Sequence, residues 1–275
     1  MYTIENEILK VTFDEVGAVL TSIIDKRRDK EILYQKDPKF WAFQDVVMFP
    51  ILGPGKTRFM GKDVEMRQHG FLREQTLVAE QVSETCVRFV FNSTPETLKI
   101  YPYDFIFTLT YMLDKDSLKY DYEIKHVSMG RMPFMLGSHT GFIINSKAFL
   151  ETDVHSFHPL DKDGLLLNSM LWKEDSNLKL TKDLFKRYHT IVLNNHHNAR
   201  FILHTGDGYL IIYNINAPLV GVWSNSEGGD FVCVEPWWGE PAYKDMPQDF
   251  AERNLVQWCK KTEKYTYSIS FKKEK

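Results

Sequence analysis

Short segments that alternate apolar and polar residues recur along this whole chain, and turn residues separate them. Alternation with a period of two is typical of strands that bury one face. The sequence Thr205-Gly206-Asp207-Gly208 stands between two such segments and is a strong hairpin signal. The clearest segments are residues 8–13, 18–24, 31–34, 105–111, 118–124, 201–204, 209–213 and 265–271.

Helical periodicity is nearly absent. Residues 248–261 are the best helical candidate, but Asn254 and the β-branched Val256 interrupt the pattern. Many strands without crossover helices indicate antiparallel sheets in a sandwich or barrel. No linker or change of composition divides the 275 residues, so we predict a single all-β domain over residues 1–275 with little helix.

Composition bounds the partners of this chain. The 43% hydrophobic and 14% aromatic content supports a large core, which excludes a disordered protein. A formal net charge of −3 gives no electrostatic reason to expect nucleic acid or an anionic membrane as a partner. The exposed edges of a large sheet would allow a homodimer.

The cysteines and the N-terminus indicate the compartment. Cys86, Cys233 and Cys259 lie far apart without CxxC spacing, so we expect neither a disulfide framework nor a structural zinc site. The first residues lack the basic and apolar regions of a signal peptide, and no apolar run approaches the ~18 residues of a membrane span. We therefore expect a soluble, cytoplasmic protein.

Three motifs place acids, bases or cations beside glycines and aromatic residues. They are His69-Gly70-Phe71-Leu72-Arg73, Gly137-Ser138-His139-Thr140-Gly141-Phe142 and Val234-Glu235-Pro236-Trp237-Trp238-Gly239. Two imidazoles, a guanidinium and a carboxylate next to paired indoles suit a site that holds a sugar and moves protons on it.

These motifs, in this order, resemble HGFxR, GxHxxF and EPWxG of the aldose 1-epimerase (galactose mutarotase) superfamily, and more closely its compact bacterial branch. The resemblance extends from the first hairpin to the last strand. It implies a large antiparallel β-sandwich of the galactose mutarotase-like supersandwich type, whose concave sheet holds the sugar. It also implies a small-molecule sugar substrate and no cofactor.

The surroundings of His139 predict a side chain that faces a ligand. His139 follows residues 132–136, which have the pattern of a buried strand. If the strand runs straight through, Gly137, His139 and Gly141 share one face. Glycines on both sides of the imidazole would clear space for a ligand.

Glu235 follows the predicted strand at residues 230–234. Pro236 lacks a backbone N–H, so we expect the strand to stop there and Glu235 to lie at a rim. Trp237 or Trp238 would partly desolvate the carboxyl group. Desolvation raises the pKa of a carboxyl group and makes it a better proton acceptor near neutrality.

His69 and Arg73 bracket a turn after a predicted strand at residues 63–67, and we expect both to donate hydrogen bonds to hydroxyl oxygens or to an anionic group. The resemblance adds Arg58 as a basic substrate contact and Asp183 as a substrate-binding carboxylate.

The resemblance also implies the reaction and the roles in it. The protein would interconvert the α and β anomers of an aldose, with Glu235 as the base and His139 as the acid. His69 would help to polarise the ring oxygen, Arg73 would orient hydroxyl groups, and an indole of Trp237 or Trp238 would stack on the sugar.

Other functions remain open from the residues alone. A sugar-binding protein without catalysis would keep the same fold and aromatic residues. A metal enzyme would use His69, His139 and Glu235 as ligands. A glycoside hydrolase would pair Glu235 with Asp183. Hexose phosphates are an alternative substrate, with Lys56, Arg58 and Arg73 as cationic contacts.

Four further histidines crowd into one part of the sequence, at His189, His196, His197 and His204. Their spacing is irregular, so we predict surface histidines and no metal site.

Overall fold

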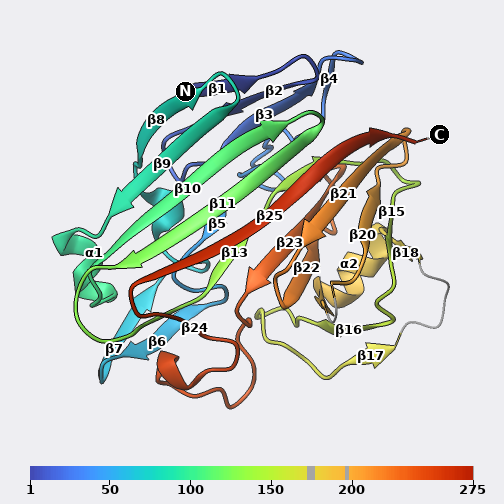
Figure 1. Cartoon of the computed structure of the whole chain (residues 1–275). Helices are drawn as coiled ribbons and strands as arrows, with labels where there is room; N and C mark the ends of the chain where they lie inside the picture. The colour runs from blue at the N-terminus through green and yellow to red at the C-terminus, as the bar shows by residue number, and fades with distance from the viewer. Residues whose placement is uncertain (172–176, 196–197, 275) are drawn as a thin grey trace.

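The computed structural model describes residues 1–171, 177–195 and 198–274. His196 and His197 therefore lie outside the described residues. Antiparallel strands dominate the fold, and the longest of them form two large sheets (Figure 1).

The larger sheet has nine strands in the order β18-β15-β20-β21-β25-β11-β10-β9-β8. Its neighbouring strands all pair antiparallel. The strands are β8 (Val78–Ser83), β9 (Cys86–Asn92), β10 (Phe105–Asp114), β11 (Ser117–His126), β15 (Phe149–Thr152), β18 (Asn177–Lys179), β20 (Phe201–His204), β21 (Tyr209–Ile215) and β25 (Thr262–Lys273).

The second sheet carries the site. Its order is β17-β16-β19-β22-β23-β13-β5, and β14 also pairs with β23. The strands are β5 (Val47–Met48), β13 (Leu136–Ser138), β14 (Gly141–Ile143), β16 (Ser156–Pro159), β17 (Met170–Leu171), β19 (Thr190–Asn194), β22 (Leu219–Trp223) and β23 (Phe231–Trp238).

Smaller elements complete the chain. A four-stranded sheet contains β1 (Tyr2–Glu5), β2 (Leu9–Phe13), β3 (Leu20–Asp25) and β4 (Lys30–Glu31). Two further pairs are β6 (Gly55–Phe59) with β7 (Lys62–Met66), and β12 (Met132–Phe134) with β24 (Gln257–Cys259). The helices are α1 (Pro95–Ile100), α2 (Lys182–Tyr188) and the 3-10 turns η1 (Leu72–Glu74) and η2 (Phe250–Glu252).

Within the described ranges, no helix has both the length and the apolar character that crossing a membrane requires.

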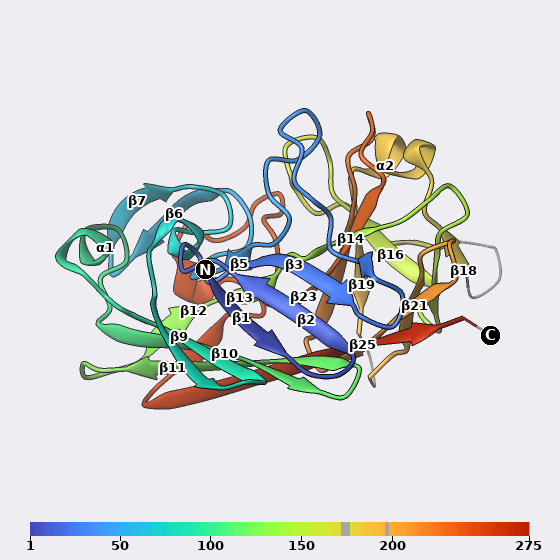
Figure 2. The same cartoon turned by 90° about the horizontal axis from the view of Figure 1, so that it is seen from above.

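The sheets pack face to face around an aromatic core, with the nine-stranded sheet as one layer (Figure 2). Trp238 of β23 contacts Tyr122 and Tyr267 of the opposite sheet, with ring centres 6.2 and 6.3 Å away. In the same way, the ring centre of Phe13 on β2 lies 4.6 Å from that of Tyr111 on β10. The alternating burial along β10 shows why period-two segments form these layers. The predicted antiparallel β-sandwich is confirmed.

Candidate functional site

A cavity of about 350 Å³ opens on the outer face of the eight-stranded sheet, away from the nine-stranded one. The face on which the cavity opens follows from β23. Trp238 points into the sandwich, and because successive side chains of a strand point to opposite faces, Trp237 and Glu235 point outward. The cavity brings together five of the residues predicted from the sequence, namely His69, Arg73, His139, Glu235 and Trp237.

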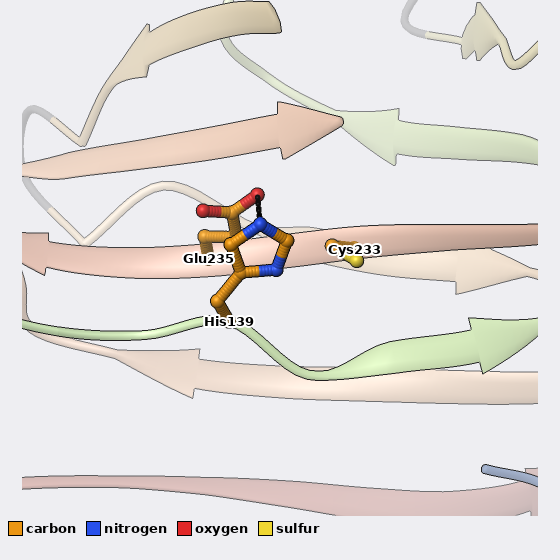
Figure 3. Close-up of side chains that lie close together, drawn as sticks. All are labelled: His139, Cys233 and Glu235. Atoms are coloured by element: carbon orange, nitrogen blue, oxygen red, sulfur yellow. Dashed lines mark ion pairs between the residues drawn. The ribbon is translucent and has the colours of Figure 1, made fainter. Parts of the chain in front are cut away.

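His139 and Glu235 face each other on neighbouring segments of the sheet. The chain is interrupted at His139-Thr140, between β13 and β14, yet both strands pair with β23 in one register. This register places His139 opposite Glu235, and its Nε2 lies 3.4 Å from Glu235 Oε1 (Figure 3). The flanking pairs are Gly137 with Trp237 and Gly141 with Cys233.

The other side of His139 is fixed by the backbone. The N–H of His139 donates to the Val46 carbonyl at 2.9 Å, and the Val46 N–H donates to the His139 carbonyl at 3.0 Å. The strand does not run straight through His139, which was the condition of our prediction that it shares a face with Gly137 and Gly141. His139 nevertheless keeps a strand-like neighbour on this side.

The glycines beside His139 make room for neighbouring apolar and aromatic side chains. A Cβ at Gly137 would lie 2.6 Å from Cε of Met48 and 3.1 Å from Cδ1 of Trp237, and one at Gly141 would lie 2.8 Å from Cζ3 of Trp41. The space that we assigned to a ligand is therefore filled by Met48 and by two indoles, and the indoles form part of the cavity wall.

Gly221 of β22 is a third such glycine, and sequence reasoning missed it. It pairs with Glu235, and a Cβ there would lie only 2.4 Å from Cζ2 of Trp237. The indole thus lies close against the β22 backbone. From this position its Nε1 donates to Glu235 Oε2 at 3.2 Å. Trp237 is therefore a hydrogen-bond donor to the carboxyl group.

Trp238 lies on the opposite face, buried against Tyr122, Tyr265 and Tyr267. It is a core residue, so the alternative that Trp238 stacks on a sugar is wrong.

The predicted end of the strand at Pro236 is also wrong, because β23 continues to Trp238. Pro236 falls opposite Ser138 at the very end of β13, one residue past the last pair between β13 and β23, and on its other side it pairs with Val220 of β22, so the strand tolerates the missing N–H. As a result Glu235 lies inside the sheet and is only 2% exposed, not at a rim.

Burial sets the protonation of the central pair. Burial raises the pKa of Glu235 to about 8, against the lowering effect of the Trp237 hydrogen bond. Burial also holds the pKa of His139 well below its usual value, and nearby His69 and Arg73 lower it further. At neutral pH the free pair therefore carries one proton, on the carboxyl group.

Aromatic rings account for the desolvation of His139. Trp41 stacks on the imidazole at 4.8 Å between ring centres, and Trp223 meets it edge-on at 5.3 Å. Sequence reasoning missed both residues. For Trp41 a signal existed, because Phe40-Trp41-Ala42-Phe43 places three aromatic residues in a segment without strand alternation.

His69 has a defined tautomer. Its Nδ1 forms a short hydrogen bond with the Leu52 carbonyl, which only accepts, so Nδ1 carries the proton and Nε2 presents a lone pair. Burial lowers the pKa of His69 to about 4, so the ring is neutral. In this tautomer His69 offers the cavity a hydrogen-bond acceptor, whereas the sequence analysis expected a donor. The backbone of His69 is left-handed (φ 68°), a strained conformation typical of functional sites.

Two predicted residues lie elsewhere. Arg58, on β6, forms an ion pair with Asp63 at 2.8 Å. Asp183 is exposed in the first turn of α2, where its carboxylate interacts favourably with the helix dipole. Neither lines the cavity, and Glu235 is the one carboxyl group among the described residues that does. A glycoside hydrolase that pairs Glu235 with Asp183 is thereby excluded.

His139, Glu235 and Cys233 lie close together (Figure 3), with ligand atoms within 4.8 Å of one another. This set differs from the His69, His139 and Glu235 set considered above. Cys233 packs in an apolar cluster with Tyr34, and burial raises the pKa of its thiol well above the usual value.

Comparisons with known proteins agree with this geometry. The sequence profile of the Aldose 1-epimerase family matches residues 1–272. The chromosomal protein LacX of Lactococcus lactis subsp. lactis is 26% identical over 265 residues, which cover 86% of this chain and 87% of LacX.

Solved structures are similar over nearly the full length. A galactose mutarotase related enzyme from Lactobacillus acidophilus is 27% identical, with a TM-score of 0.93 over 98% of this chain and 97% of that one. A galactose mutarotase-like protein from Lactobacillus casei shares the fold at 24% identity, with a TM-score of 0.91 over 99% and 100% of the two chains. The profile match over almost the whole sequence shows that this chain belongs to the aldose 1-epimerase family.

Proposed function

We propose that the protein interconverts the α and β anomers of an aldose, with Glu235 and His139 as the catalytic pair. The observation that carries the proposal is the 3.4 Å approach of the two side chains in a desolvated cavity. The reaction needs a base at the C1 hydroxyl group and an acid at the ring oxygen O5. A buried carboxyl and imidazole that share one proton supply both.

The proton movements balance in each direction. Glu235 takes the proton from the C1 hydroxyl, the C1–O5 bond breaks, and His139 gives a proton to O5. Rotation about C1–C2 turns the aldehyde. O5 then attacks the other face of C1 and returns its proton to His139, while Glu235 returns its proton to O1. No net proton is gained or lost.

The active form of the pair has the proton on His139 and a carboxylate at Glu235. This form and the resting form have the same number of protons, so pH does not select between them. The Trp237 N–H favours the active form, because a hydrogen bond to a carboxylate is stronger than one to a neutral carboxyl group. His69 Nε2 would accept a hydrogen bond from a sugar hydroxyl.

The cavity suits a single sugar ring. Its volume of about 350 Å³ lies in the range of small-molecule sites. Trp41, Trp223 and Trp237 give it apolar walls that would exclude water from the proton transfers.

Polarimetry of freshly dissolved α-D-galactose and α-D-glucose tests the proposal. Purified protein should speed the approach to anomeric equilibrium in proportion to its concentration. A protein that binds these sugars, as seen by quenching of tryptophan fluorescence, and leaves the rate unchanged would be a sugar-binding protein instead.

A further inference from the structure

A chain of hydrogen-bonded side chains crosses the core behind the catalytic pair. The hydroxyl of Tyr267, on β25 of the nine-stranded sheet, donates to Ser138 Oγ at 2.7 Å. Ser138 Oγ lies 3.4 Å from Thr140 Oγ1, which donates to Asp45 Oδ1 at 2.7 Å. All four side chains are buried. The chain therefore connects the nine-stranded sheet to the two residues that flank His139 in the sequence.

Asp45 fixes the direction of these hydrogen bonds. Burial raises the pKa of its carboxyl group to about 6, so the group is ionised at neutral pH and only accepts hydrogen bonds. Thr140 then donates to Asp45 and can only accept from Ser138, which itself accepts from Tyr267. Hydrogen bonds that run in one direction toward a charge strengthen one another. We therefore expect the loss of one hydroxyl group to weaken the whole chain.

The chain reaches the site where the second sheet is interrupted. His139 and Thr140 belong to neither β13 nor β14. Val46 exchanges two backbone hydrogen bonds with His139. Its neighbour Asp45 also accepts the Leu20 N–H at 2.9 Å, on β3. The segment that carries His139 is thus held by backbone pairing on one side and by the hydroxyl chain from within the core.

A buried carboxylate costs stability, and an apolar side chain of similar volume would avoid the cost. The charge of Asp45 is accounted for if it specifies one position of the interrupted segment. That position sets the 3.4 Å distance between His139 Nε2 and Glu235 Oε1. A displacement of about 1 Å at a reacting group can reduce a rate by about 100-fold.

We propose that Tyr267 is a positioning residue for the catalytic pair, although it lies on the opposite sheet and does not line the cavity. Its hydroxyl acts through Ser138 and Thr140 to hold His139 opposite Glu235. The inference rests on the proposed anomer interconversion and adds a residue that acts on the pair through the core.

Tyr267→Phe tests the inference because it removes only the hydroxyl group. The ring keeps its stacking on Tyr120, with ring centres 4.2 Å apart. Polarimetry on the α-anomer of the sugar that wild type converts fastest gives kcat and KM. We expect kcat to fall about tenfold through misplacement of His139. KM should stay nearly unchanged, because the cavity wall keeps its side chains.

Tyr209→Phe is the matched control. Tyr209 also lies on the nine-stranded sheet, on β21, and its buried hydroxyl donates to the buried Asp25 carboxylate at 2.8 Å. Neither Tyr209 nor Asp25 lines the cavity. This variant should lower the Tm about as much as Tyr267→Phe does and leave kcat at the wild-type value.

A double-mutant cycle tests the path through the chain. Thr140→Val removes the hydroxyl group between Ser138 and Asp45, so the chain is already broken in this background. Adding Tyr267→Phe should then change kcat by less than about twofold. The same tenfold loss in both backgrounds would show that Tyr267 acts by another route, against the inference.

A wild-type kcat in Tyr267→Phe, or an equal loss of kcat in Tyr209→Phe, would overturn the inference. If no sugar is turned over, the proposed reaction fails, and NMR still tests the positioning of His139. Its side-chain nitrogen resonances, assigned by their loss in His139→Gln, should shift in Tyr267→Phe and stay in place in Tyr209→Phe. Unshifted resonances in Tyr267→Phe would contradict the positioning role on their own.

Discussion

Glu235 Oε1 and His139 Nε2 lie 3.4 Å apart, and Oε1 has no hydrogen-bond partner within the described structure. The two groups are therefore close enough to act on one sugar, yet they are not locked to each other. Burial disfavours the charge on each of them, so their protonation must be treated as one system.

The pair predicts the pH dependence of the reaction. Catalysis needs one proton on the pair, and this proton is lost as pH rises through about 8, the pKa of Glu235. Activity as kcat/KM should be level near neutrality and fall above about pH 8. It should fall again in acid, where His139 also becomes protonated, below the ordinary pKa of histidine. A rate that increases steadily from pH 7 to 10 would contradict a shared proton.

Trp237→Phe should move the alkaline limb of the pH profile, which is the fall of kcat/KM above about pH 8. The indole N–H lowers the pKa of Glu235, so its loss should raise that pKa and shift the limb to higher pH. A hydrogen bond of about 0.5–1.5 kcal/mol corresponds to about half to one pH unit. Trp238→Phe is the control, because it removes core contacts on the other face and should lower the Tm without moving the limb.

Gly221→Ala should damage the site through Trp237. The new Cβ would lie 2.4 Å from Cζ2, so the indole must shift, at about 1–3 kcal/mol of stability. The shift would also misplace the donor to Glu235, and we expect kcat to fall about tenfold or more. In a Trp237→Phe background the smaller ring should reduce both effects. Equal costs in the two backgrounds would show that Gly221 acts independently of the indole.

Thr140 should position His139 from behind the sheet. Its hydroxyl donates at 2.7 Å to Asp45, a buried carboxyl that also accepts the Leu20 N–H at 2.9 Å. Thr140→Val removes one hydrogen-bond donor to Asp45 and should lower the free energy of unfolding by about 1–3 kcal/mol. We expect kcat to fall with KM nearly unchanged. Thr140→Ser, which keeps the hydroxyl, should restore kcat, and a Ser variant as slow as the Val variant would exclude this role.

The strands were predictable because their signal is local. Residues 201–204 coincide with β20, and the predicted strand at 209–213 lies within β21. The short helices left no comparable signal, since six or seven residues complete fewer than two turns. For α1, however, Thr94 and Pro95 form a recognisable start, with Thr94 as the N-cap.

The sequence indicated several residues that meet at the candidate site, but not what surrounds them. His139 and Glu235 stand out because each lies two residues from a glycine or a tryptophan. The roles of Gly221 and Trp41 depend on strand pairing and packing between segments far apart in sequence, which alternation alone does not specify. The prediction that the strand ends at Pro236 failed because the effect of a proline depends on whether the neighbouring strand needs the missing N–H as a donor.

Glu235→Gln should leave the fold intact. The folded pKa of Glu235 is raised, so an ionised Glu235 destabilises the folded state progressively as pH rises from about 4.5 to about 8. Glutamine removes this penalty. Thermal unfolding should therefore give a Tm at pH 9 no lower than that of wild type, and a large drop would contradict the assigned burial of the carboxyl group.

The most direct test compares wild type and Glu235→Gln in the same polarimeter, on the α-anomer of the sugar that wild type converts fastest. We predict that the variant, folded to the same extent, loses about 100-fold or more of the catalysed rate, as expected for the loss of a proton-transfer group. A variant that equilibrates the anomers at the wild-type rate would contradict the assignment of Glu235 as the base.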